Sequence, residues 1–479
     1  MTKDILYILF AQGTFILSGY VLHIFVGRSL GPDLYGIFGI ITSFYFIFER
    51  LLGGSISKGL SKFVAENGQA ARSIINFAIK IQIFLSIVIL LVFYAGASLI
   101  ANLMRDLNLT AYLQILSFLI IISGFYILYS AILNGLRAFY KQAIVTVVFA
   151  FARILFVVLL VIAGFSIKGA IWGLVLAGIA CLWLSWHYCK PLTGKDKFDK
   201  KALIGFSFKV LSFTFGIQLI MNIDLIFVKI ILKDGLSTGL YTAITNLARI
   251  PMLIVLPVSI VIFPYIVKAI SDNETGLANN YINRILRYLV LFLVPFSLMV
   301  SGTSKEIISL IYGDMYSGAA TGLSILIFGL TFIAISIIMN TIILAVCDLT
   351  IFLLFNIFLT LLDAALNFLL INNFGLPGAA IATTVSGFIG CIFSIVYVFS
   401  YFPFTIKWKS FFNIISSSLI IYLLSIKFSF SGIYLLVTYL ILYGIYFSIL
   451  LVLKEIDSKD FNTLKNITFI KPIISKKTA

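Results

Sequence analysis

The stretch QAIVTVVFAFARILFVVLLVIAG, residues 142–164, decides the fold class of this chain. It is long enough for an α-helix to cross a bilayer, which takes roughly 20 apolar residues, and Arg153 is its only charge. Similar runs recur throughout the chain, which is 61% hydrophobic and 11% charged, whereas soluble domains carry about 25% charged residues. The runs lack the alternation of barrel strands, and only helices or closed barrels satisfy the backbone in lipid. The sequence therefore predicts an all-α integral membrane protein.

The recurring apolar runs predict fourteen transmembrane helices. The first run is too long for the apolar core of a cleaved signal peptide and is expected to remain as helix one. The predicted helices cover residues 5–27, 34–64, 73–98, 111–134, 142–164, 168–188, 203–232, 236–265, 283–301, 319–344, 349–371, 377–400, 411–427 and 432–453.

The net charge of +16 follows the membrane topology and does not indicate a nucleic-acid partner. When the loops are assigned alternately from a cytoplasmic N-terminus, most of the 34 Lys and Arg residues fall on the cytoplasmic side, as the positive-inside rule requires. We therefore expect a multi-pass protein of the cytoplasmic membrane with both termini in the cytoplasm. The loops on the other side contain only Arg28, Arg105, Lys168, Lys233, Lys305 and Lys427.

The second half of the chain repeats the pattern of the first. Residues 24–26 (IFV) return at 226–228 (IFV), and residues 35–38 (YGIF) align with 238–241 (TGLY). Six helices in each repeat place both halves in the same orientation, so the expected symmetry axis lies along the membrane normal. A duplicated structural bundle without transport is the alternative. The predicted parts are an N-terminal lobe at 1–188, a basic cytoplasmic linker at 189–202, a C-terminal lobe at 203–401, helices 13 and 14 at 402–453, and a basic cytoplasmic tail at 454–479.

Helix-breaking residues occur at matching places in the two repeats. Gly53 and Gly54 interrupt the second predicted helix, and Pro251 and Pro257 interrupt the eighth, with Gly54 aligned to Pro257. Interrupted helices at corresponding positions indicate a transporter binding site, although Gly and Pro also cause ordinary kinks in membrane helices. We interpret these four residues as hinges or cavity walls.

Arg50 and Arg249 are near the middle of the two interrupted helices. A central charge costs roughly 2.5–3.5 kcal/mol on insertion scales and must face a polar cavity or a partner. Arginine stays charged when desolvated and presents a planar fork that matches phosphate oxygens. The sequence therefore predicts that Arg50, Arg249 and the adjacent Glu49 form an anion-binding substrate site. The alternative is that Glu49 and neighbouring polar groups simply neutralise the arginines.

Three further charges in predicted helices are candidates for pairing or ion coupling. Interpolation of the repeat places Arg153 opposite Asp363, which suggests a pair between the lobes, and Asp224 lies in the outer third of its helix. Lys229, near an external end, is expected to snorkel to the membrane surface. If the acids bind cations instead, the chain is an ion-coupled drug or metabolite antiporter.

Three segments resemble the polysaccharide repeat-unit flippases of the multidrug/oligosaccharidyl-lipid/polysaccharide exporter superfamily. RSLGPDLYGIF at 28–38 is similar to their first external loop, and GSISKGLSKFVAE at 54–66 to the end of helix two in the branch of stage V sporulation protein B. FGLPGAAIA at 374–382 is similar to their loop before helix twelve. With the repeat, the resemblance covers nearly the whole chain.

The resemblance implies a MATE-like fold and a flippase for polyprenyl-phosphate-linked oligosaccharides. It also implies no catalytic residue and no cofactor apart from a coupling ion, Na+ or H+. We expect a monomer without a metal site that contacts membrane lipids and polysaccharide-assembly proteins. An enzyme is disfavoured because the longest predicted loops, near 189–202, 266–282 and 302–318, lack an Asp-x-Asp pair.

Overall fold

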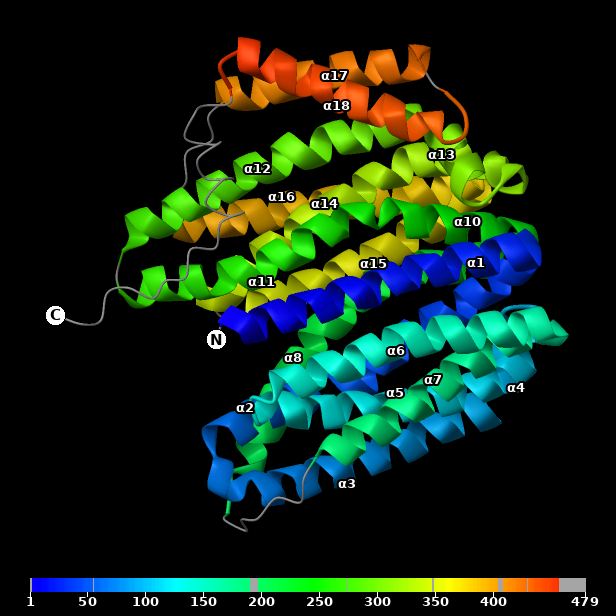
Figure 1. Ribbon diagram of the computed structural model, residues 1–479, viewed down its shortest axis with the longest axis vertical. Helices are drawn as coiled ribbons and strands as arrows, with labels where there is room; N and C mark the ends of the chain where they lie inside the picture. Colours follow the sequence, from blue (N-terminus) through cyan, green and yellow to red (C-terminus); the bar gives the residue numbers. More distant parts are fainter. Residues whose placement is uncertain are drawn as a thin grey trace. The chain divides into compact units, whose positions relative to one another are not determined.

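The structure is a computed structural model that describes residues 2–54, 56–189, 197–272, 274–346, 349–403, 408–428 and 430–455. Half of the predicted basic linker (190–196) and nearly all of the predicted basic tail lie outside the described residues. Within the described residues every regular element is a helix, which confirms the predicted all-α class (Figure 1).

Long α-helices follow one another along the chain, with short π-helical and 3-10 segments at several junctions. The α-helices are α1 Thr2–Glu49, α2 Ile56–Glu66, α3 Ala71–Leu90, α4 Ala97–Leu103, α5 Leu109–Gly135, α6 Phe139–Leu160, α7 Ser166–Tyr188, α8 Lys200–Ile220, α9 Ile223–Leu232, α10 Gly235–Ala248, α11 Ile250–Ser271, α12 Thr275–Gly302, α13 Ser304–Ile311, α14 Ala320–Val346, α15 Leu349–Phe374, α16 Leu376–Tyr401, α17 Trp408–Lys427 and α18 Tyr434–Val452. The short segments are η1 Arg50–Gly54, η2 Gly68–Ala70, η3 Leu91–Ala95, η4 Val161–Phe165 and η5 Asp314–Ala319.

The chain is a multi-pass membrane protein, but the predicted number of fourteen spans is not confirmed. In the described part, 11 helices are long and apolar enough to cross a membrane, or up to 12 if a bent helix pair is one span. Two continuous stretches, Leu6–Glu66 with 61 residues and Phe139–Tyr188 with 50, account for part of the difference. A straight helix of such length is at least about 75 Å long, more than twice the hydrocarbon core. Each stretch contains a glycine with positive φ, Gly31 at 76° and Gly164 at 89°, where the helix can change direction.

The chain packs as two compact units. The first unit comprises Lys3–Asn246 and Asp348–Ser386. The second unit comprises Met1–Thr2, Leu247–Cys347 and Gly387–Ala479. These units follow the density of packing, whereas the predicted lobes follow the symmetry of the sequence, so the lobe boundaries stay a prediction.

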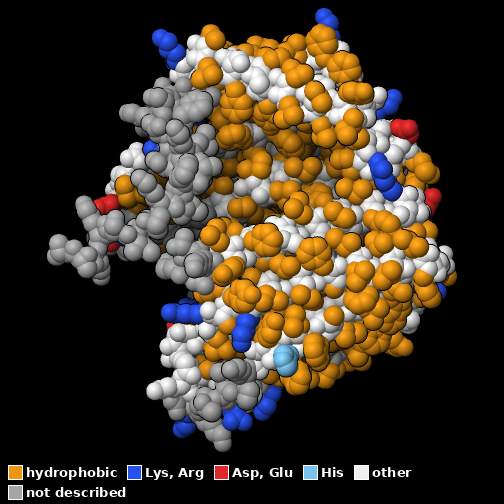
Figure 2. All heavy atoms as spheres, viewed as in Figure 1, with side chains coloured by type: hydrophobic (Ala, Val, Ile, Leu, Met, Phe, Trp, Pro, Cys, Tyr) orange, Lys and Arg blue, Asp and Glu red, His pale blue; other side chains and the backbone are white. Residues whose placement is uncertain are grey.

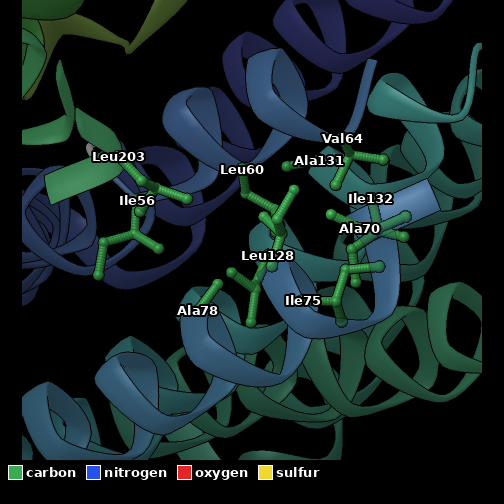
Figure 3. Packing of buried hydrophobic residues seen from close by; sticks show 12 residues of the cluster. Ile56, Leu60, Val64, Ala70, Ile75, Ala78, Leu128, Ala131, Ile132 and Leu203 are labelled. Carbon is green, nitrogen blue, oxygen red and sulfur yellow. The ribbon is translucent and has the colours of Figure 1, made fainter. Parts of the chain in front are cut away.

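Aliphatic side chains fill the interior of the first unit. Ile56 and Leu60 of α2 belong to one buried cluster with Leu128 of α5 and Leu203 of α8 (Figure 3). Hydrophobic side chains also cover most of the molecular face visible in Figure 2. Because lipid tails are as apolar as leucine, close packing and not exclusion from water selects helix contacts inside a bilayer. The fit between helices therefore decides which contacts form.

Glycines allow α1 and α10 to touch through their backbones in the first unit. A Cβ on Gly36 would lie 2.7 Å from the Gly239 nitrogen, and a Cβ on Gly239 would overlap the Pro32 carbonyl. Beside this contact, Asn246 Nδ2 donates a hydrogen bond of 2.9 Å to the Tyr35 hydroxyl. Gly36 and Gly239 are equivalent positions of the predicted repeat, and equivalent residues that lie next to a two-fold axis meet across it. The contact agrees with two pseudo-repeats.

A buried ion pair joins α9 to the segment between α4 and α5. Lys229 Nζ lies 2.7 Å from Asp106 Oδ2, and the two side chains are 4% and 18% exposed. The expectation that Lys229 snorkels is therefore wrong, because its ammonium group ends on a carboxylate within the protein. The other carboxylate oxygen of Asp106 accepts a hydrogen bond of 3.2 Å from the Asn108 backbone nitrogen.

In the second unit, α17 and α18 lie side by side (Figure 1) and pack against α12. The Tyr446 hydroxyl donates a hydrogen bond of 2.9 Å to the Leu291 carbonyl. At the end of α18, Glu455 Oε1 lies 3.3 Å from Arg287 Nε and accepts a hydrogen bond from Ser410. These polar contacts attach the last described segment to α12 and α17.

Candidate functional site

A polar pocket opens in the first unit where α1 ends. Its volume is about 340 Å³, in the lower part of the range for small-molecule sites, roughly 300–1,000 Å³. Its walls come from the end of α1, from η1, α2 and α5, and from one residue of α6. The lining residues are Glu49, Arg50, Gly53, Gly54, Ser57, Lys58, Ser61, Ile127, Ser130, Ala131, Asn134 and Gln142.

The π-helical segment η1 forms one side of this pocket. It covers Arg50–Gly54 and contains both glycines of the predicted break. A side chain at Gly53 would require Ile127 to move, because its Cβ would lie 2.7 Å from Ile127 Cδ1. Single π-helical turns inside membrane or soluble helices often mark functional sites. The sequence thus located the irregular backbone, while its role as a hinge stays a prediction.

The pocket contains two cationic side chains and one carboxylate. Arg50 Nε lies 3.9 Å from Glu49 Oε2, and the side chains are 47% and 16% exposed. This is the limit of an ion pair, and it engages one nitrogen of a group with five N–H donors. Lys58 is exposed and lines the same pocket. Glu49 therefore engages only part of the positive charge that lines this pocket, and the anion-binding role of the site stays a prediction.

Neutral hydrogen-bonding groups form another part of the pocket wall. Ser61 Oγ donates a hydrogen bond of 2.7 Å to Asn134 Oδ1, and Asn134 Nδ2 donates one of 3.0 Å to Gln142 Oε1. The hydroxyl of Ser57, which is 4% exposed, has no hydrogen-bond partner among the described residues. A buried hydroxyl without a partner is costly, so this group is suited to bind a ligand atom.

Arg249 belongs to the second unit and lies at a bend. The axes of α10 and α11 differ by 41° at this residue, and its side chain is half-buried. Pro251 stands in the first turn of α11, where a proline removes no intrahelical hydrogen bond. Pro257 lies inside α11, which continues to Ser271. The break therefore falls before both prolines, and the shared substrate site of Arg50 and Arg249 stays a prediction.

A cluster of buried oxygen atoms surrounds two acids of the first unit. Asp224 and Asp363 are 1% and 0% exposed, and they are close enough for their charges to interact. Asp224 Oδ2 accepts hydrogen bonds from the Tyr241 hydroxyl at 2.8 Å and from the Thr383 hydroxyl at 3.3 Å. Asn367 Nδ2 donates one of 3.2 Å to Asp363 Oδ2. Such oxygen-rich groups suit a hard cation or a proton.

The predicted pair of Arg153 and Asp363 is not found among the described residues. Arg153 Nε donates a hydrogen bond of 3.0 Å to Ser18 Oγ, and the guanidinium also donates to the Phe15 carbonyl. The guanidinium group of Arg153 stacks on the Phe15 ring, and its Cζ atom lies 4.2 Å from the ring centre. The prediction was wrong because equivalent positions of a repeat need not face each other. Arg153 instead links α6 to α1.

A family model for polysaccharide biosynthesis proteins matches residues 25–321. The chain belongs to this family. The matched segment includes the pocket, Arg249 and Asp224, while Asp363 lies beyond it. No curated protein sequence matches this chain.

Solved structures of membrane transporters share the fold of this chain. The lipid II flippase MurJ in an inward closed conformation has a TM-score of 0.74 at 18% identity and covers 97% of this chain and 100% of its own. An inward-facing multidrug resistance transporter of the MATE family has a TM-score of 0.69 at 14% identity. The match covers 80% of this chain and 94% of the transporter. A MOP superfamily transporter from Pyrococcus furiosus has a TM-score of 0.64 at 16% identity. The match covers 84% of this chain and 96% of the transporter. These similarities confirm the predicted MATE-like fold.

Several residues of the pocket were not predicted from the sequence. Ser57 and Lys58 follow Arg50 by about two helical turns, a spacing that places residues on one face, so they could have been found. Asn134 and Gln142 lie at the ends of two predicted helices, where polar residues are common. Nothing in the sequence distinguishes them from loop residues.

Proposed function

We propose that this chain moves a polyprenyl-phosphate-linked oligosaccharide across the cytoplasmic membrane, with the phosphate bound by Arg50 and Lys58. The observation that carries the proposal is the pocket at η1, which places two cations against one carboxylate inside a membrane-spanning stretch. Cations at membrane depth are costly unless a partner or a polar cavity compensates them. A bound phosphate supplies that compensation.

The chemistry of the pocket suits a phosphate group better than a carboxylate. The guanidinium of Arg50 offers paired N–H donors to two oxygens, while the ammonium of Lys58 acts as a point charge. The unpartnered Ser57 hydroxyl adds a neutral donor to the same pocket. Together they can satisfy more oxygens than one carboxylate has.

The family supports a lipid-linked saccharide as the substrate. Members of the family are polysaccharide biosynthesis proteins, and a polyprenyl chain can remain in the bilayer while its head group enters the protein. The pocket of about 340 Å³ is too small for a whole oligosaccharide, so only the groups next to the phosphate bind in it. We infer that the two lobes rock against each other to carry the head group across.

The buried acids provide a site for a coupling ion. Asp224 and Asp363 repel each other in a medium of low dielectric, and a cation or a proton relieves that repulsion. The oxygens of Thr383 and Asn367 lie in the same cluster. We infer that Na+ or H+ binds there and drives the conformational change.

The charge distribution supports the proposed direction of transport. Both termini face the cytoplasm, as the bias of Lys and Arg toward one side requires, so the saccharide moves from the cytoplasmic to the outer leaflet. The protein works as a monomer next to polysaccharide-assembly proteins and needs no cofactor other than the coupling ion.

The proposal is tested by the binding of a short polyprenyl diphosphate saccharide to purified protein in nanodiscs. Arg50→Gln and Lys58→Gln are each expected to weaken binding by about tenfold, the equivalent of one charged hydrogen bond. Lys62→Gln is the matched control, because Lys62 lies one turn beyond Lys58 on α2, outside the pocket. Unchanged affinity in the Arg50→Gln/Lys58→Gln double variant would contradict the phosphate site.

An ion-coupled antiporter for cationic drugs or metabolites is the second candidate. The buried cluster of Asp224 and Asp363 favours it, since carboxylates bind cations, and the fold is shared with a multidrug resistance transporter. Uptake of a cationic dye into proteoliposomes that depends on both acids, with no binding of the polyprenyl ligand, would establish this function instead.

A further inference from the structure

The hydrogen bonds among Ser61, Asn134 and Gln142, the neutral wall of the pocket, all run in one direction. The hydrogen bonds run from the Ser61 hydroxyl to the Asn134 carbonyl oxygen and from the Asn134 amide nitrogen to the Gln142 carbonyl oxygen. Each amide thus uses its oxygen within the wall. A primary amide has two N–H groups, so one N–H of Asn134 and both of Gln142 are not used by these two bonds. The wall therefore offers donors to the pocket.

The Ser57 hydroxyl strengthens this donor character. It is 4% exposed, lines the same pocket and has no hydrogen-bond partner among the described residues. A ligand group that accepts hydrogen bonds relieves the cost of this buried hydroxyl, whereas a purely apolar group does not.

The charges of the pocket decide between a neutral acceptor and an anionic one. In the proposed function the phosphate groups engage the two cations, Arg50 and Lys58, and Glu49 lies in the same pocket. A second anion on the first sugar, such as a uronic carboxylate, would meet the Glu49 carboxylate without a cation left to balance it. An amide carbonyl accepts the same hydrogen bonds without added charge.

We propose that Asn134 and Gln142, positioned by Ser61, select a sugar with an acetamido group next to the phosphate. This inference rests on the proposed function, because it assumes that the phosphate occupies the Arg50 and Lys58 side of the same pocket. The amides of Asn134 and Gln142, the amide wall, then bind the substituent of the first sugar, while the cations bind the diphosphate. Specificity and anchoring therefore reside in different residues.

The test compares two polyprenyl diphosphate ligands that differ only at carbon 2 of the sugar, an acetamido group in one and a hydroxyl in the other. Wild-type protein in nanodiscs is expected to bind the acetamido ligand about tenfold more tightly, which corresponds to about 1.4 kcal/mol. Gln142→Met keeps the length of the side chain but has no donor. It is expected to reduce the ratio of the two ligand affinities to about one. Asn134→Ala interrupts the wall independently and should give the same result.

The controls separate this inference from the proposed function. Arg50→Gln should weaken the binding of both ligands and leave the ratio of their affinities unchanged. Size-exclusion profiles verify that each variant is folded. If wild type binds both ligands equally, or Gln142→Met and Asn134→Ala keep the preference, the amide wall does not read the sugar. If Arg50→Gln and Lys58→Gln bind both ligands as wild type does, the phosphate site itself fails.

Discussion

Replacing Asp106 by alanine should destabilise the protein more than replacing its partner Lys229 by methionine. Lys229 is 4% exposed and Asp106 is 18% exposed, so the two halves of this ion pair are unequal. Without the carboxylate, a buried ammonium group loses its compensating charge, which costs roughly 3–5 kcal/mol. Without the ammonium group, Asp106 keeps some access to water and its hydrogen bond from Asn108. Lys229→Met is therefore expected to cost less, roughly 1.5–3 kcal/mol.

The double variant Asp106→Ala/Lys229→Met gives the sharpest outcome. It removes both charges, so it is expected to be more stable than Asp106→Ala alone, although it carries one more substitution. The measurement is the midpoint of thermal unfolding in one detergent, followed by intrinsic tryptophan fluorescence. Lys305→Met, at an exposed lysine of α13, controls for the loss of a positive charge.

The order of the unfolding midpoints shows whether the uncompensated charge of Lys229 causes the instability. The expected order is wild type, Lys229→Met, the double variant close to it, and Asp106→Ala lowest. A double variant that unfolds below Asp106→Ala would refute the reasoning, because an uncompensated lysine would not then be the cause of the instability.

Three other perturbations follow from the packing. Gly239→Leu should prevent the recovery of folded protein on size exclusion, because its Cβ overlaps the Pro32 carbonyl; wild-type recovery would show that α1 and α10 do not touch as described. Glu455→Ala should lower the unfolding midpoint, at a cost of roughly 1–3 kcal/mol, because Arg287 loses this partner, and Glu455→Gln should lie between the two; an unchanged midpoint in both would contradict the attachment of α18. Burial raises the pKa of the Cys189 thiol to about 11, although Lys141 opposes this. In a variant whose other cysteines are serine, maleimide labelling should therefore keep accelerating with pH up to that value, since the thiolate reacts; a rate that levels off at about pH 8.5, the ordinary thiol value, would contradict it.

The sequence predicts those features of the site that a single helix determines. Gly53 and Gly54 indicate an irregular backbone, and η1 lies there. Arg50 is the central cation of the same stretch, and it lines the pocket. Composition and the length of the apolar runs suffice for the fold class, because a bilayer permits few alternatives for a backbone.

Contacts between helices are much harder to predict from the sequence. Arg153 binds Ser18 and the Phe15 carbonyl of α1 and does not meet the residue that the repeat places opposite it. Lys229 ends on Asp106, more than one hundred residues away along the chain. Which polar groups meet depends on the crossing of two helices, and this crossing is set by small residues such as Gly239 that have no polar signal of their own. The amide wall of the pocket escaped prediction for the same reason.

Translocation of a fluorescent polyprenyl diphosphate saccharide in proteoliposomes tests the central claim most directly. A membrane-impermeant quencher reads the fraction of the lipid in the outer leaflet. Wild-type protein is expected to make the inner pool accessible as well, while the Arg50→Gln/Lys58→Gln double variant should leave it protected, as in protein-free vesicles. If the inner pool stays protected with folded wild-type protein under both Na+ and H+ gradients, the chain is not the proposed flippase.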